Sequence, residues 1–289
     1  MKLIVKFNLV LLLVFAICFV VVGFITNRLL QRNAKQEIVE NARIMMEAAL
    51  AVRSYTSTEI KPLLSTQLKY SFLPQSVPAY SANQYFGHLR KKFPDYSYKE
   101  ATLNPTNPIN RATDWEADLV NKFRQTPGLP EIVGERDTPS GRVLYMARPM
   151  KIDASCLYCH DTPSAAPATM IERYGSANGF GWKSNEILTA QIVSTPMQLP
   201  IQRANTALAG FLISLAAVFV VIVLALNGML MFLVVRPVNE LSRIANEVSL
   251  GNLDAPDFET SSKDEISTLA QYFNRMRKSM TEAIKLLET

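Results

Sequence analysis

The sequence predicts an α+β domain between two membrane-spanning helices, followed by a pair of amphipathic helices. Two long runs without a charged residue divide the chain into N-terminal, middle and C-terminal parts. The middle part mixes helical periodicity with strand and hairpin signals, which is typical of a small antiparallel sheet with helices packed on it. The C-terminal part carries apolar residues at heptad spacing, which predicts helices that pack side by side.

The two uncharged runs predict transmembrane helices at residues 7–27 and 207–235. Each run is long enough to cross about 30 Å of hydrocarbon as a helix. A cleaved signal peptide is the alternative for the first run, but its apolar part exceeds the usual length of about 7–15 residues and no small-residue cleavage site follows. We therefore expect an uncleaved anchor after a short N-terminal segment, residues 1–6, with Cys18 as an apolar filler.

The segment between the spans, residues 28–206, is expected to begin as a continuation of the first helix. No glycine occurs between Arg28 and Leu64, and apolar residues recur at helical spacing until Pro62 ends or kinks the helix. Further helices are predicted at 81–92 and at 114–124, the second capped by Asp114. Strands are predicted at 96–103, 131–136, 142–151 and 186–194, with a hairpin turn at 138–141.

A short motif follows the second strand of this hairpin: Cys156-Leu157-Tyr158-Cys159-His160. A C-x-x-C-H run is the attachment site of a c-type haem, in which two thiols form thioethers and the histidine supplies one axial nitrogen to the iron. The chain contains only 3 cysteines and 2 histidines, so a chance match is improbable. The motif therefore predicts one covalent haem c, held by Cys156, Cys159 and His160.

Three other interpretations of the motif remain open. A zinc site needs four ligands, and His88 is the remaining candidate for the fourth. A redox-active C-x-x-C pair would open a helix after a strand in a βαβ unit, which the pattern does not predict. A plain disulfide would suit an exported domain. The adjacent histidine and the predicted exported location together favour haem.

The second axial ligand of the iron is open. His88 is one candidate, Tyr55 and several methionines are others, and an empty or water-filled position is equally compatible. Two protein ligands favour electron transfer or redox sensing, whereas an open position permits gas binding. Arg53 and Arg148 are candidate partners of the haem propionates, although each is equally well explained as a solvated charge. Trp182 is a candidate to lie on the porphyrin or, equally, a core residue.

Several short motifs recur in a fixed order over about residues 40–195: Val52–Tyr55, Ile60–Pro62, Val77–Ala79, Asn107–Asn110 before Glu116, Cys156–His160 and Gly179–Lys183. In this order they resemble a cyanobacterial-type extracytoplasmic sensor domain family, formerly a domain of unknown function. The resemblance implies a PAS-like antiparallel sheet, one covalent c-type haem and a sensory role. It does not imply which stimulus is sensed.

Residues 236–289 follow the second span and predict two heptad helices, with apolar stripes at Val238, Leu241, Ala245 and Val248 and at Ile266, Leu269, Phe273, Met276 and Met280. Two such helices cannot bury their stripes alone, so we expect a homodimer that forms a parallel four-helix bundle. Pro237 at the membrane exit, the Gly251-Asn252-Leu253 connector and Asp264-Glu265-Ile266 resemble a HAMP domain. Ser267 stands where that family usually has glycine.

Composition argues against several functional classes. The formal net charge is +5, but the basic residues are scattered, which does not favour a nucleic-acid partner. The sequence has no glycine-rich phosphate loop, and no acid–base pair or nucleophile arrangement that would indicate an enzyme. Haem attachment to C-x-x-C-H takes place outside the bacterial cytoplasm, so residues 28–206 are expected outside the inner membrane and both ends inside. Lys2, Lys6 and Arg236 fit the positive-inside rule, whereas Arg28 and Lys35 do not.

The expected function is signal transduction across the plasma membrane. The haem would sense redox state or a small ligand and signal through the HAMP segment to a separate cytoplasmic partner chain, since no kinase, cyclase or methyl-accepting pattern follows. Dimerisation through the transmembrane helices and the HAMP segment is part of this expectation. A membrane-anchored mono-haem c-type cytochrome for electron transfer is the alternative, and it would not need residues 236–289. A sensor of another ligand with a vestigial motif is a third interpretation.

Overall fold

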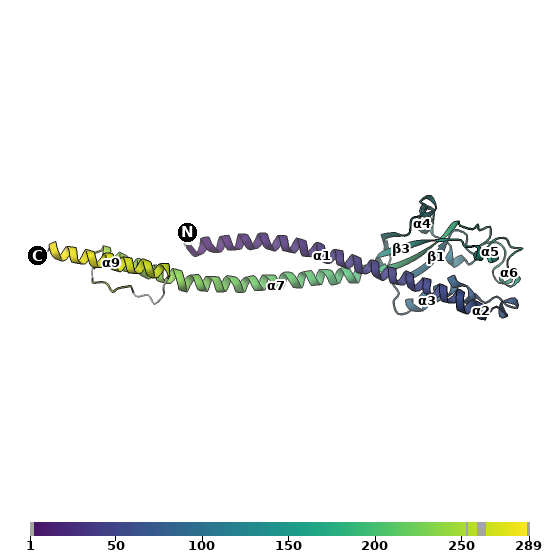
Figure 1. Ribbon diagram of the computed structural model, residues 1–289, viewed down its shortest axis with the longest axis horizontal. Helices are drawn as coiled ribbons and strands as arrows, with labels where there is room; N and C mark the ends of the chain where they lie inside the picture. Colours follow the sequence, from purple (N-terminus) through teal and green to yellow (C-terminus); the bar gives the residue numbers. More distant parts are fainter. Residues whose placement is uncertain (1–2, 253, 259–263, 288–289) are drawn as a thin grey trace. The chain divides into compact units, whose positions relative to one another are not determined.

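The computed structural model describes residues 3–252, 254–258 and 264–287. Lys2 and Leu253, which the sequence analysis used, lie outside the described residues. The fold is mixed α+β, with long helices and a four-stranded antiparallel sheet (Figure 1). The chain divides into an α+β unit, Thr26–Leu208, and a helical unit formed by Met1–Ile25 and Ala209–Thr289.

The first helix, α1 (Leu3–Tyr55), is continuous over 53 residues and passes from the helical unit into the α+β unit. A π-helical turn, Thr56–Ile60, and the short helix α2, Lys61–Leu63, follow it. The hydroxyl of Thr56 donates to the carbonyl oxygen of Val52 at 2.8 Å, and Ser57 and Thr58 make the same bond to the fourth residue before them. Such bonds compete with the α-helical ladder before the chain reaches Pro62, which lacks an N–H. The α-helix therefore ends at Tyr55, directly before the π-helical turn that leads to α2, and not at Pro62 as the sequence predicts.

The sheet contains β1 (Ser97–Thr102), β2 (Ile132–Thr138), β3 (Gly141–Lys151) and β4 (Ile187–Pro196), in the order β1-β4-β3-β2. All neighbouring strands are antiparallel. The four predicted strands are therefore confirmed, with shifts of a few residues at their ends. The hairpin between β2 and β3 turns at Pro139 and Ser140, inside the predicted turn.

Helices cover both faces of the sheet. Alternate side chains of a strand point to opposite faces, so Tyr98 and Val193 pack against α1, whereas Ala101 and Ile192 pack on the other face. Helix α3 (Pro78–Arg90) joins the core on the α1 face. Helix α4 (Asp114–Gln125) covers the opposite face.

The cap of α4 differs from the sequence analysis. Asp114 is the first residue of the helix, and the cap is Thr113, which forms a capping box with Glu116. The backbone N–H of Thr113 donates to a Glu116 carboxylate oxygen at 2.8 Å. A threonine followed three residues later by glutamate satisfies two free N–H groups at once, which a lone Asp114 cap does not.

Short elements fill the long connections of the α+β unit. They are 3₁₀ turns at Gln67–Lys69, Pro74–Ser76, Pro108–Asn110 and Ala154–Cys156, and the helices α5 (Leu157–His160) and α6 (Ala168–Tyr174). The ring of Phe72 meets the ring of Tyr174 edge-on, with centroids 5.7 Å apart. The connection after α2 therefore packs against α6.

The helical unit contains the second long apolar helix. It runs as α7 (Gln198–Leu230), which begins in the α+β unit, a π-helical turn (Met231–Val235) and α8 (Arg236–Ser249). Both α1 and α7 contain an exposed apolar stretch long enough to cross a membrane, so each is a candidate span. Asn8 and Asn227 exchange reciprocal amide hydrogen bonds of 2.7 and 2.8 Å between these two helices.

Helix α9 (Glu265–Leu287) packs on α8 in the same unit. Leu241 and Val248 of α8 are buried against Ala270 of α9 and Phe258 of the connector. The Asn274 side chain accepts from the N–H of Phe258 at 3.1 Å and donates to its carbonyl at 3.0 Å, which holds the connector in place. The predicted stripes are only partly buried by this packing, because Val238, Leu269, Met276 and Met280 stay exposed.

Candidate functional site

The Cys156–His160 segment begins five residues after the end of β3. Ile152 is tied to the start of β4, since its N–H donates to the carbonyl of Glu186 at 2.9 Å. The Asp153 carboxylate accepts from the N–H of Ser155 at 2.8 Å, and the Cys156 N–H bonds to the carbonyl of Asp153 at 3.0 Å. These bonds start the single helical turn that carries the motif. The sheet therefore fixes where the motif begins.

The three motif side chains lie on this one turn. Cys156 and Cys159 are free thiols of intermediate exposure, three positions apart and so on one side of the turn. The pKa of the Cys159 thiol is raised by burial, while Lys61 of α2 opposes this shift through its positive charge. Burial therefore keeps the thiol protonated, and Lys61 lies close enough to act on it electrostatically.

The imidazole of His160 is held through one ring nitrogen. Its Nδ1 lies 2.8 Å from the carbonyl oxygen of Gly179 and 3.3 Å from Thr106 Oγ1. A carbonyl can only accept, so Nδ1 carries the proton and Nε2 has the free lone pair. Among the described residues, none forms a hydrogen bond with Nε2. A histidine in this tautomer can ligate iron or another metal ion through Nε2.

A tryptophan fixes the plane of this ring. The Trp182 indole stacks on the His160 imidazole, with centroids 3.9 Å apart and planes 11° apart. The Trp182 Nε1–H donates to the carbonyl of Asn104 at 3.2 Å, and its backbone N–H bonds to the carbonyl of His160 at 3.1 Å. The pKa of His160 is lowered by burial, which the bond to Gly179 only partly offsets, so the ring is neutral near pH 7.

Asn104 joins the two loops that support the ring. Its side-chain oxygen accepts from the N–H of Gly179 at 3.0 Å, and its amide nitrogen donates to the carbonyl of Phe180 at 3.1 Å. Gly179 has φ +87°, and a Cβ there would lie 2.8 Å from the Thr106 Cα. Only glycine fits a backbone that approaches this closely in the left-handed region.

These residues fit a covalently attached haem. Two free thiols and a neutral histidine with an available Nε2 are the donor set that c-type attachment needs. Zinc is less well served, because no group of three or more His, Cys, Asp or Glu within the described ranges could hold a metal ion. The observed donor chemistry therefore favours haem over zinc.

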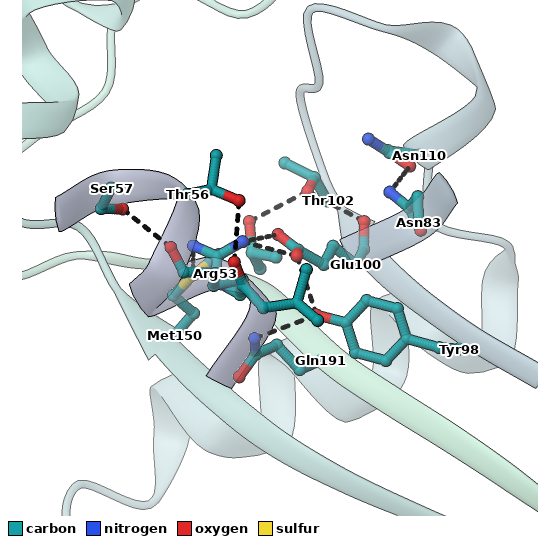
Figure 2. Close-up of polar contacts among 12 residues, drawn as sticks. Arg53, Thr56, Ser57, Asn83, Tyr98, Glu100, Thr102, Asn110, Met150 and Gln191 are labelled. Atoms are coloured by element: carbon teal, nitrogen blue, oxygen red, sulfur yellow. Dashed lines mark hydrogen bonds and ion pairs between the residues drawn. The ribbon is translucent and has the colours of Figure 1, made fainter. Parts of the chain in front are cut away.

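A buried polar cluster lies on the α1 face of the sheet (Figure 2). The Arg53 guanidinium donates to both Glu100 carboxylate oxygens, at 2.5 and 2.6 Å, and contacts the Met150 sulfur at 3.2 Å. The Tyr98 hydroxyl donates to Glu100 at 2.8 Å and accepts from the Gln191 amide at 3.0 Å. Burial and the neighbouring Glu100 charge both raise the pKa of Tyr98, so its hydroxyl remains a donor.

The other predicted site residues lie elsewhere in the α+β unit. Arg148 is paired with Glu47 at 2.6 Å and with Glu131 at 3.2 Å. Tyr55 is 53% exposed at the end of α1, and His88 is exposed in the last turn of α3. The described contacts of the His160 ring come from Thr106, Gly179 and Trp182 and include neither side chain. Propionate pairing of Arg53 and Arg148 and ligation by His88 or Tyr55 stay predictions.

Sequence reasoning missed the residues that orient His160. Thr106 and Gly179 contact the ring, and Asn104 holds Gly179 in place. They come from two loops that are about 75 residues apart in sequence, as the separation of Asn104 and Gly179 shows. The Gly179–Lys183 motif is visible in the sequence, but nothing in its spacing predicts a carbonyl aimed at His160. Glu100 was missed as well, since a charged residue in a strand is ordinarily exposed.

Comparison with known proteins gives two family matches and one similar solved structure. The model of the Tll0287-like family matches residues 31–196, more than half of the chain, and the HAMP domain model matches residues 229–282. The crystal structure of the cyanobacterial heme-protein Tll0287 is similar, with a TM-score of 0.43 and 18% identity, over 55% of this chain and 95% of that one. No curated protein matches the chain. The chain therefore belongs to the Tll0287-like family and carries a HAMP domain after the family domain.

Proposed function

We propose that the chain is a membrane-bound signalling protein whose α+β unit carries one covalent haem c. The observation that carries the proposal is the His160 ring, tied through Nδ1 to Gly179 and directly preceded by two free thiols three positions apart. When bound, the haem supplies an iron that changes oxidation state or takes a small ligand. The family relationship and the HAMP domain support a sensory role.

Each residue of the site has a defined task in this proposal. Cys156 and Cys159 hold the group through thioether bonds, and His160 ligates the iron through Nε2. The Gly179 carbonyl fixes the ring tautomer, and Trp182 limits rotation of the ring. Arg53, Arg148, Tyr55 and Trp182 are further candidates to contact the group, and His88 is a candidate for the sixth position.

The proposal places the chain in the bacterial inner membrane. Residues 7–27 and 207–235 cross it, residues 28–206 lie outside the cytoplasm with a PAS-like fold, and residues 236–289 are cytoplasmic. The exposed apolar stretches of α1 and α7 support the spans. The C-x-x-C-H motif supports the orientation, since haem is attached to it outside the cytoplasm.

A HAMP domain implies a dimeric signalling assembly. We infer that a second copy of the chain covers the exposed stripe of Val238, Leu269, Met276 and Met280, which completes a parallel four-helix bundle. The output then passes to a separate cytoplasmic protein that reads the bundle. We propose binding and signalling, and no catalysis, for this chain.

Haem staining of denatured protein tests the attachment. Full-length protein is produced in cells that mature c-type cytochromes, because a covalent haem survives denaturation. We expect a stained band for the wild type, for Cys18→Ser and for His88→Ala. We expect no band for the Cys156→Ser, Cys159→Ser double variant, and an altered absorption spectrum for His160→Ala. An unstained wild-type protein would remove the proposal.

The electron-carrier alternative makes a different prediction about the HAMP segment. A sensor must change the bundle when its haem changes state, whereas a carrier need not. A cysteine placed at Leu269 in the Cys18→Ser background reports the bundle through disulfide formation between two copies. We expect its crosslinking rate to differ between ferric and ferrous protein. Equal rates would favour electron transfer over signalling.

A further inference from the structure

Four ion pairs among the described residues join α1 to residues in, or next to, the strands of the sheet. They are Lys35–Glu135 at 2.9 Å, Arg43–Glu131 at 3.1 Å, Glu47–Arg148 at 2.6 Å and Arg53–Glu100 at 2.5 Å. In the first three pairs the α1 side chain is 42–60% exposed, so water screens the charges. In the fourth pair Glu100 is only 3% exposed. Burial therefore distinguishes this pair from the other three.

The strand register explains why Glu100 is buried. Glu100 stands opposite Gln191 of β4, which stands opposite Arg148 of β3, so a polar row crosses the α1 face of the sheet. The neighbouring row is Tyr98, Val193 and Met146, which belongs to the apolar core under α1. Arg53 reaches the polar row from the end of α1. A buried charge pair of this kind is an uncertain source of stability, because desolvation opposes the attraction.

The pair contacts the strand that precedes the candidate haem segment. The Arg53 guanidinium contacts the sulfur of Met150, the penultimate residue of β3, and β3 leads directly into the Cys156 turn. Burial lowers the pKa of Arg53, but the Glu100 charge and smaller interactions, among them one with Cys156, raise it overall. Arg53 interacts weakly with Cys156, the first cysteine of the C-x-x-C-H motif, through its charge. It also lies three residues before the π-helical turn.

We propose that the buried Arg53–Glu100 pair transmits a change of iron charge to α1. This inference rests on the proposed function, because it requires a haem attached at Cys156 and Cys159. Reduction by an external one-electron donor converts ferric to ferrous iron, lowers the charge of the site by one unit, and makes or breaks no bond to the protein. Arg53 is then repelled less and Glu100 is attracted less. Since the two residues belong to α1 and β1, the change acts on the contact between helix and sheet.

If the charge of the iron acts on the pair, the charges of the pair act equally on the iron. The proposal can therefore be measured as a shift of the haem reduction equilibrium. A buried unit charge that acts over a separation of about 10 Å, at an effective dielectric constant of about 20, changes a reduction equilibrium roughly tenfold. A tenfold change corresponds to about 59 mV for a one-electron couple. An exposed pair farther along α1 is screened by water and salt and changes the equilibrium by less than about twofold.

The experiment is a redox titration of haem absorbance in full-length protein reconstituted in lipid. Glu100→Gln leaves Arg53 uncompensated, so we expect it to favour the ferrous form by roughly tenfold. Arg53→Gln leaves Glu100 uncompensated, so we expect a shift of similar size in the opposite direction. The reduction equilibrium of the double variant should return to within about twofold of the wild-type value. Arg43→Gln, which breaks an exposed pair of the same helix, should also remain within about twofold of the wild-type value. General loosening of the site would shift both single variants the same way.

Shifts of equal sign, or shifts no larger than that of Arg43→Gln, would overturn the inference while leaving the haem assignment intact. A wild-type protein without haem would overturn both, and the stain reports this before the titration. A further measurement uses wild-type protein alone, so it does not depend on whether a variant folds. We expect backbone amides at residues 50–60 to exchange hydrogen at different rates in ferric and ferrous wild-type protein, with residues 33–40 unchanged. Equal rates at residues 50–60 would contradict the inference.

Discussion

The α1–sheet interface and the His160 pocket, by which we mean the residues that hold the ring (Asn104, Thr106, Gly179 and Trp182), are built in different ways. The interface consists of regular elements whose apolar side chains share the packing, among them Met46, Phe86 and Met146. The pocket consists of loops, and each support of the ring is a single hydrogen bond or a single stacked ring. Loss of one side chain from the interface should therefore lower stability and leave the chemistry unchanged. Loss of one contact from the pocket should redirect His160 in a protein that still folds.

Truncation of Phe86 should give the largest effect. Phe86 is 1% exposed and stacks on Tyr98 with centroids 4.9 Å apart. Phe86→Ala should lower the free energy of unfolding by about 3–5 kcal/mol, measured by urea denaturation. Haem content per folded molecule should stay at the wild-type value. Tyr85→Ala, at the 45% exposed neighbouring position, is the control and should cost far less. A loss of haem from folded Phe86→Ala would contradict the separation of the two regions.

Gly179→Ala should affect the pocket first. The added Cβ would meet the Thr106 backbone, and the positive φ adds strain, so we expect a loss of about 1–3 kcal/mol in unfolding free energy. The Gly179 carbonyl would move away from His160, which should change the haem absorption spectrum. Gly175→Ala is a matched control, because Gly175 also has positive φ, +77°, with nothing near its Cβ position. A wild-type spectrum for Gly179→Ala would show that the carbonyl does not orient the ring.

Removal of the Asn104 side chain should cost somewhat less. Asn104→Ala loses the bonds to the Gly179 N–H and the Phe180 carbonyl, and we expect a decrease of about 1–2 kcal/mol in unfolding free energy. Ferric and ferrous spectra should broaden as the His160 ring gains freedom. The control is Asn107→Ala, which loses one exposed bond to the N–H of Ile109. If both variants gave wild-type spectra, the link between the loops would be purely structural.

The exposed ion pair between Lys35 of α1 and Glu135 of β2 should give the smallest effect. The pKa of Glu135 is lowered by the hydrogen bond from Lys35, which outweighs the opposing effect of burial. A lowered folded-state pKa stabilises the protein above the unfolded value and loses that contribution as pH falls through the folded value. Glu135→Gln should therefore reduce the fall in unfolding free energy below about pH 4.5 by a few tenths of a kcal/mol, and less in high salt. A steeper fall of unfolding free energy with falling pH in Glu135→Gln than in the wild type would contradict the direction assigned to the pKa of Glu135.

Sequence patterns predicted most of the regular structure. Four strands, the two long apolar helices and the HAMP helices follow from local periodicity, and periodicity is a property of neighbouring residues. The cap of α4 was wrong, because Thr113 and Glu116 act together whereas each residue alone resembles ordinary loop or helix sequence. The candidate attachment residues Cys156, Cys159 and His160 could be predicted as a set, because c-type attachment requires fixed spacing.

The sequence alone determined that a C-x-x-C-H motif lies between two long apolar runs with heptad helices behind them, since each of these features is written in consecutive residues. The tertiary structure alone decided that Gly179 and Asn104 orient His160 and that Glu100 is a buried partner of Arg53. These contacts join residues 19, 75 and 47 positions apart. Their geometry depends on how loops and strands meet in space, and no local pattern encodes it.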